Sequence, residues 1–277
     1  MRYRYFDPQR VPKTPFIPAV DTLVRAPAPL PSKVDFSDLC VIRDQGAEGA
    51  CSGFGETGQY QVARAVGGYP EPGMLFSPQF LYYLEGLQEG HPGQDTGAVP
   101  TDGLAILQHI GVAPEDLDPY VVGQIKPPSK QAMAAAGKYR IKSWSPVSRI
   151  SSSTFRTSLM PVLQLLAQRG PLNIAIAVYQ SFEDAANGII PMPGPDDPLL
   201  GGHDMYLVGY RDDPTFPGGG CVTAANSWGK GWGQGGFALI PYAYVSDPEL
   251  TLGLWSIELA PPVPPKAPLA QHLCGGD

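Results

Sequence analysis

The spacing of hydrophobic and polar positions changes about halfway along the chain. In the first half, apolar residues recur at helical spacing, as at Leu104, Leu107 and Ile110. Ser77 followed by Pro78 has the form of an N-cap with proline at the first helical position. The second half has one short helical pattern over residues 160–168, and short apolar runs that predict strands over residues 172–178, 205–210, 221–226, 236–242 and 252–259. Helices followed by strands predict an α+β protein of two lobes, with a ligand site between them.

Proline concentrates at the two ends of the chain. Residues 1–34 hold seven of the 32 prolines and no glycine, and residues 261–277 hold five more. Such segments favour extended, polyproline-like structure and cannot fold alone. The apolar side chains of Tyr3, Tyr5, Phe6, Phe16 and Ile17 could still anchor the first segment. We therefore expect residues 1–34 to form a strap over or beside the site that restricts access to it. A disordered tail is the alternative.

The charge balance excludes several classes of function. The net charge is −7, and no cluster of Lys and Arg provides the basic face that a nucleic-acid partner needs. No apolar run approaches the roughly 20 residues that span a bilayer. The N-terminus has no apolar core of a standard signal peptide. We therefore expect a monomer without nucleic-acid or membrane partners, in the cytoplasm or exported by a route without such a leader.

The four cysteines are far apart in the sequence. Cys40, Cys51, Cys221 and Cys274 form no CxxC pair and no Cys/His cluster at zinc-ligand spacing, so no metal site is expected. Their density is too low for a disulfide scaffold. Cys40, Cys221 and Cys274 are interpreted as free thiols.

Cys51 differs from the others because four glycines surround it between residues 46 and 55. A helix beginning at Cys51 would favour a thiolate through its free N–H groups and its dipole. A thiol also needs an imidazole to accept its proton, and His203 precedes an apolar strand. Asn226 could orient that imidazole, and the Gln45 amide could stabilise an oxyanion. Gly53 and its neighbours nevertheless make the local helix propensity poor.

These residues occur in an order that resembles the papain family of cysteine peptidases, in particular its short bacterial members. The resemblance runs from about residue 34 to about residue 242. It rests on the spacing from Gln45 to Cys51 and on SPQFLYY (77–83), GLAILQHIGV (103–112), GPLNIAIAVYQSFEDAANGII (170–190), GGHDMYLVGY (201–210) and ANSWGKGWGQGGFALIPY (225–242).

The resemblance implies a role for each of four residues. Cys51 would be the nucleophile and His203 its partner as general base and acid. Asn226 would orient His203, and Gln45 would share the oxyanion hole with the Cys51 backbone N–H.

The resemblance further implies a substrate cleft. Gly97 would pair with substrate backbone by strand addition, and Gly202 would leave one wall of the specificity pocket without a side chain. Trp228 would shield the Asn–His hydrogen bond from water, and Trp232 would line the leaving-group side. The implied fold is papain-like: residues 35–260 form the peptidase domain, with a connecting segment (35–50), a helical lobe (51–115) and an antiparallel β lobe (116–260), followed by a Pro-rich tail (261–277).

Two departures from the family pattern keep other functions open. Ser52 stands where the family usually has Trp, and Glu48 stands where it usually has a disulfide cysteine. The expected function is a cysteine endopeptidase that acts on peptides or proteins through a Cys51 thioester and needs no cofactor. The alternatives are a catalytically inactive papain-like binding module and a Cys–His acyl or glutamyl transferase.

Overall fold

The computed structural model describes residues 5–11, 29–147, 150–151, 154–155 and 159–260. Predictions for the rest of residues 1–34, for the tail 261–277 and for Cys274 lie outside the described residues. The helices are α1 (Cys51–Val66), α2 (Pro78–Gln88), α3 (Pro100–His109), α4 (Lys130–Ala136), α5 (Leu159–Arg169), α6 (Gln180–Glu183) and α7 (Tyr242–Ser246). The strands are β1 (Lys33–Asp35), β2 (Ile141–Pro146), β3 (Ile150–Ser151), β4 (Thr154–Phe155), β5 (Leu172–Tyr179), β6 (Leu199–Asp212), β7 (Gly220–Ala225), β8 (Phe237–Pro241) and β9 (Thr251–Leu259).

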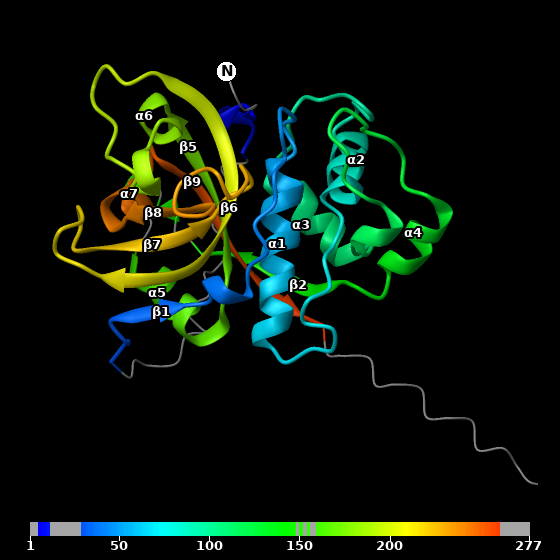
Figure 1. Cartoon of the computed structure of the whole chain (residues 1–277), viewed down its shortest axis with the longest axis horizontal. Helices are drawn as coiled ribbons and strands as arrows, with labels where there is room; N and C mark the ends of the chain where they lie inside the picture. The colour runs from blue at the N-terminus through cyan, green and yellow to red at the C-terminus, as the bar shows by residue number, and fades with distance from the viewer. Residues whose placement is uncertain (1–4, 12–28, 148–149, 152–153, 156–158, 261–277) are drawn as a thin grey trace, which may run out of the picture.

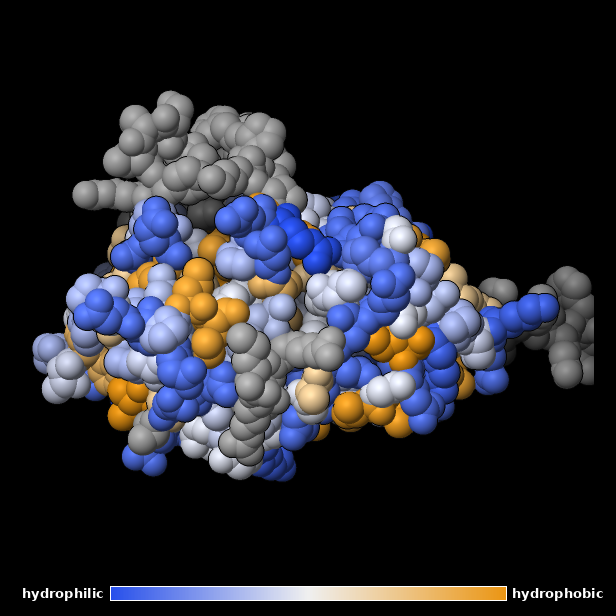
Figure 2. Space-filling view, turned by 90° about the horizontal axis from the view of Figure 1, so that it is seen from above, coloured by the Kyte–Doolittle hydropathy of each residue, from blue (hydrophilic) through white to orange (hydrophobic). Residues whose placement is uncertain are grey.

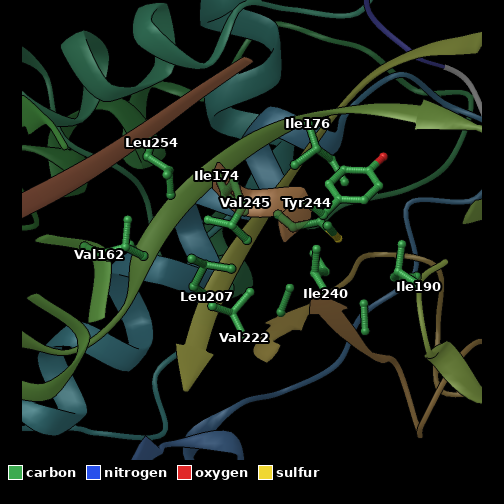
Figure 3. Packing of buried hydrophobic residues seen from close by; sticks show 14 of the residues in the cluster. Val162, Ile174, Ile176, Ile190, Leu207, Val222, Ile240, Tyr244, Val245 and Leu254 are labelled. Atoms are coloured by element: carbon green, nitrogen blue, oxygen red, sulfur yellow. The ribbon is translucent and has the colours of Figure 1, made fainter. Parts of the chain in front are cut away.

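An antiparallel sheet forms one lobe and helices form the other (Figure 1). The strand order is β2-β9-β5-β6-β7-β8, and β1 pairs with β6. The apolar runs of the second half of the sequence supply its interior, where Ile174, Leu207, Val222 and Ile240 pack against α5 and α7 (Figure 3). The α+β, two-lobed fold expected from the sequence is confirmed.

Helix α2 begins where the sequence predicts. The Ser77 hydroxyl accepts a hydrogen bond from the Phe80 backbone N–H, and Pro78 occupies the first turn. Helix α3 begins at Pro100. Both helices bury one apolar face in a cluster that includes Phe80, Leu81 and Leu107.

Helix α1 runs between the two lobes (Figure 1). Its glycines allow a close approach to β6: a Cβ at Gly58 would lie 2.3 Å from the Tyr206 ring, and one at Gly55 would lie 2.1 Å from an Asp204 oxygen. Tertiary packing therefore explains a helix that local propensity does not favour. The N-terminus of α1 is held at the junction of the lobes.

Strand β2 and helix α4 are among the elements that the sequence did not predict. Strand β2 pairs with β9 at the sheet edge, and Ile141 at its start packs in the cluster of the helical lobe. Ala132 and Ala136 of α4 join that same cluster, although they follow the predicted lobe division at residue 116. The exact division between the lobes stays a prediction.

Figure 2 shows the molecule from above, which is the side where the described N-terminal residues 5–11 lie in Figure 1. Where described residues are visible on it, apolar residues form small patches among polar ones. No helix among the described residues has the length and apolar character needed to cross a membrane.

Candidate active site

Cys51 is the first residue of α1 and is fully buried. The backbone N–H groups of Asp204 and Ser52 favour its thiolate form. Burial nevertheless raises the pKa of the Cys51 thiol well above its ordinary value, and the negative charge of Asp204 adds to the rise. Both effects favour the neutral thiol over the thiolate.

His203 lies in β6, and its side chain is hydrogen-bonded to Asn226, which follows β7. The distance from His203 Nε2 to Asn226 Oδ1 is 2.8 Å, and the same oxygen accepts the Ser227 backbone N–H at 2.7 Å. Because this amide oxygen can only accept, His203 Nε2 carries the proton and Nδ1 of the neutral ring is left as a base. Nδ1 is buried and has no hydrogen-bond partner among the described residues. Burial lowers the pKa of His203 to about 4, against a smaller rise from the Asn226 bond.

Two tryptophans cover this pair. The Trp228 ring stacks on His203 with 4.6 Å between centroids and 29° between the planes. Trp232 packs edge-on against Trp228 at 4.9 Å and donates its indole N–H to the Glu183 carbonyl. Trp228 is placed to exclude water from the His–Asn bond, whereas the described contacts of Trp232 are to residues of its own lobe.

The Gln45 amide is fixed on both sides. Ser227 Oγ donates to Gln45 Oε1 at 2.5 Å, and Gln45 Nε2 donates to the Glu48 carbonyl at 2.7 Å. An amide NH₂ group has two hydrogens, so one N–H stays available after the bond to Glu48. Cys51, His203, Asn226 and Gln45 are thus linked through Asp204 and Ser227 into one site, and their catalytic roles remain predictions.

The N-terminal strap, by which we mean the described residues 5–11, lies on this site. Phe6 and Gly202 exchange two backbone hydrogen bonds of 3.0 and 2.8 Å, as in an antiparallel sheet. Phe6 is 1% exposed and packs in one cluster with Cys51 and Trp255. A Cβ at Gly202 would lie 2.3 Å from the Phe6 ring, and a Cβ at Gly97 would lie 3.0 Å from Phe6 Cβ. Both glycines predicted to contact substrate therefore contact the strap.

The strap is anchored on both lobes. The Tyr5 hydroxyl donates to a Glu183 carboxylate oxygen at 2.7 Å on the β lobe. On the helical lobe, Arg10 pairs with Glu89 and donates to the Thr96 carbonyl at 3.2 Å. The strap therefore has polar contacts with both lobes.

Three contacts at the site were not predicted from the sequence. Ser227 supports Gln45, and its position next to Asn226 was the only available signal. Ser52 Oγ donates to Glu85 Oε2 at 2.7 Å, which accounts for a small polar residue after the nucleophile. The Glu48 carboxylate accepts from the Tyr120 hydroxyl at 2.7 Å, so a carboxylate at that position has a half-buried hydrogen-bond partner. Among the described residues, no group of three metal-ligating side chains is present.

Comparison with known proteins agrees with this geometry. The family model described as papain family cysteine protease matches residues 30–246. An uncharacterized peptidase C1-like protein of Acanthamoeba polyphaga mimivirus is 27% identical over 222 residues, which cover 78% of this chain and 68% of that protein. Cathepsin K of Mus musculus is 27% identical over 217 residues, covering 76% and 60% of the two chains.

Solved structures show the same fold. Xylellain, a cysteine protease from Xylella fastidiosa, has a TM-score of 0.76 at 27% identity, covering 94% of this chain and 98% of that one. Bromelain from Ananas comosus has a TM-score of 0.61 at 18% identity, covering 83% and 100%, and supports the fold alone. Because the family model spans most of the chain, the protein belongs to the papain family of cysteine proteases, and it is a papain-like cysteine peptidase.

Proposed function

We propose that the protein hydrolyses peptide bonds through a covalent thioester on Cys51. In the first half-reaction the Cys51 thiolate forms a bond to the scissile carbonyl carbon, and His203 holds the proton taken from the thiol. The oxyanion receives hydrogen bonds from the free Gln45 N–H and the Cys51 backbone N–H. The C–N bond then breaks, and the His203 proton leaves with the amine.

The second half-reaction regenerates the enzyme. His203 takes a proton from water as the water oxygen attacks the thioester carbon. The C–S bond breaks, a carboxylic acid leaves, and Cys51 recovers its proton. The observation that carries this proposal is the bond from His203 Nε2 to Asn226 Oδ1, because it leaves Nδ1 as the basic nitrogen of the ring.

Replacing the nucleophile tests the chemistry. A thiol-directed epoxide should label Cys51 and stop peptide hydrolysis, and Cys51→Ala should lose hydrolysis by at least about a thousandfold. Cys221→Ala is the matched control, because Cys221 is also buried but lies in β7 away from the site. Full hydrolysis by Cys51→Ala would contradict the mechanism. No labelling and no turnover would favour a binding module, and transfer to an added amine in preference to water would favour a transferase.

We further propose that the N-terminal strap restricts access to the site. Phe6 pairs with Gly202 by strand addition, so the strap occupies the backbone groups that we assign to substrate. Burial also opposes ionisation of Cys51 and His203, so covering the site acts on both access and reactivity. In this proposal Gly97 and Gly202 contact substrate backbone, and Trp232 lines the leaving-group side, after the strap has moved.

Deletion of residues 1–11 tests the strap. The deletion removes the described strap and ends well before Pro31, which accepts a hydrogen bond from Tyr210, and before β1, which pairs with β6. The shortened chain should be alkylated at Cys51 and should hydrolyse peptide at least about tenfold faster, which corresponds to roughly 1.4 kcal/mol of strap binding. Equal alkylation and hydrolysis rates in the two chains would contradict the restriction while leaving the mechanism intact.

A further inference from the structure

A loop of the helical lobe packs against the segment that carries Gln45. The Tyr120 hydroxyl lies 2.8 Å from the Gln45 carbonyl oxygen and 2.7 Å from Glu48 Oε2. The Gly123 backbone N–H donates to the other oxygen of the Glu48 carboxylate. Val122 covers Gly46, where a Cβ would lie 2.8 Å from the valine side chain. The two segments thus meet through polar and apolar contacts.

Glu48 is buried although it carries a carboxylate. It is 4% exposed, and both of its oxygens receive hydrogen bonds from the 120–123 loop. A carboxylate buried without such donors would be costly. Its place in the chain is three residues before Cys51, and its own backbone carbonyl accepts the Gln45 side-chain N–H. Side chain and backbone of Glu48 therefore connect the loop directly to the Gln45 amide.

We infer that Glu48 and Tyr120 are positioning residues for the oxyanion hole, a role that rests on the function proposed above. The Tyr120 hydroxyl has one hydrogen, which it shares between the Gln45 carbonyl oxygen and Glu48 Oε2. Glu48 holds the Gln45 side chain through its own backbone oxygen. Ser227 Oγ donates to Gln45 Oε1, and one amide N–H donates to Glu48, so only the second N–H can point toward substrate. The hydrogen bonds to the amide fix the direction of that N–H. The pair acts on the reaction through Gln45 and has no contact with the reacting atoms.

Tyr120 also connects this arrangement to the helix of the nucleophile. Its ring packs edge-on against Phe54 of α1, with 4.7 Å between centroids. Tyr120 therefore contacts the two segments that carry the proposed oxyanion hole, namely the backbone of Gln45 and the first turn of α1. Loss of the hydroxyl alone should release the Gln45 segment and leave the ring contact in place.

Hydrogen-bond deletions in a cycle test the inference. Tyr120→Phe, Glu48→Gln and the double variant are made in the full chain and in the chain lacking residues 1–11. Each single variant should lower kcat for peptide hydrolysis about tenfold with little change in KM, because the lost interaction stabilises the transition state. The double variant should be no worse than about twice the stronger single variant, because both bonds serve one arrangement.

A second readout separates positioning from a general loss of structure. Alkylation of Cys51 by iodoacetamide needs the thiolate but forms no oxyanion, so its rate should change less than about twofold in both variants. Tyr139→Phe is the matched control, since Tyr139 is a half-buried tyrosine of the same lobe that packs on Phe76. It should leave kcat unchanged.

Three results would overturn the inference. These are an unchanged kcat in Tyr120→Phe, a fall in alkylation equal to the fall in kcat, and strictly additive effects in the double variant. Failure of the proposed function gives a different result, because the parent chain would then be alkylated without hydrolysing any peptide. If Glu48→Gln does not fold, the kcat and the Cys51 alkylation rate of Tyr120→Phe alone still test the inference.

Discussion

Gly202 is the residue at which substrate access and the strap meet. Its N–H and C=O both bond to Phe6, and the missing side chain leaves the space that the Phe6 ring fills. The sequence predicted an open wall of the specificity pocket at this glycine. It could not show that an aromatic residue nearly 200 positions earlier fills the opening, because that contact depends on the path of the whole chain.

A methyl group at Gly202 should therefore displace the strap. In Gly202→Ala the new Cβ would lie 2.3 Å from the buried Phe6 ring, and overpacking of this kind costs about 1–3 kcal/mol. Alkylation of Cys51 in the full chain should accelerate about tenfold or more. Gly194→Ala is the control, because a Cβ there would meet no atom within 4 Å. Equal alkylation rates in Gly202→Ala and the parent would show that the ring is not held against this glycine.

At the scale of elements, helix α1 shows which features the sequence could predict and which depend on tertiary contacts. The motif order identified Cys51, His203 and Asn226, and the apolar patterns predicted α2, α3, α5 and most of the sheet. The glycines of α1 argued against a helix, and the close approach of Asp204 to Gly55 and of Tyr206 to Gly58 explains them. Contacts that join distant segments, such as β2 with β9, leave no local pattern in the chain.

Behind the nucleophile, α1 also buries two carboxyl groups together with α2. Glu56 and Glu85 are both fully buried. A Cβ placed on Gly103 would lie 1.9 Å from Glu56 Oε2 and 2.2 Å from Glu85 Oε1. The two oxygens are thus within about 4 Å of each other. Burial raises the pKa of both groups, and that of Glu85 rises to about 8. The negative charges of nearby acidic groups add to the rise in both cases.

This pair should make the stability of the fold depend on pH. A carboxyl whose pKa is higher in the folded state stabilises the fold below its unfolded value of 4.5, and that contribution is lost as pH rises toward about 8. The free energy of unfolding should therefore fall between these values, by up to about 1.4 kcal/mol per pH unit for each group. Glu85→Gln keeps an acceptor for Ser52 and should reduce the slope measured by urea unfolding, whereas the exposed Glu249→Gln should not. A parent protein with no slope in this window would rule the effect out.

At the scale of the whole molecule, the strap joins two lobes that are otherwise connected through α1 and the β2 edge. Its anchors differ in kind: Tyr5 donates a neutral hydroxyl to Glu183 on one lobe, and Arg10 forms an ion pair with Glu89 on the other. Glu89 is 9% exposed and Arg10 is 29% exposed, so salt screens this pair less than a surface pair. Release of either end would uncover the site from that side.

The Arg10 anchor should contribute measurably to this closure. Hydrogen bonds to charged groups contribute about 1.5–3 kcal/mol, so Arg10→Ala should accelerate alkylation of Cys51 in the full chain by about tenfold or more. The alkylation rate of the chain lacking residues 1–11 should set the upper limit of the acceleration that Arg10→Ala can produce. Lys33→Ala serves as the control, because its exposed ion pair with Asp35 lies in β1. Tyr5→Phe should add to Arg10→Ala, since the two anchors lie on different lobes and share no partner. An unchanged rate in Arg10→Ala, with acceleration in Tyr5→Phe, would place the closure on the β lobe alone.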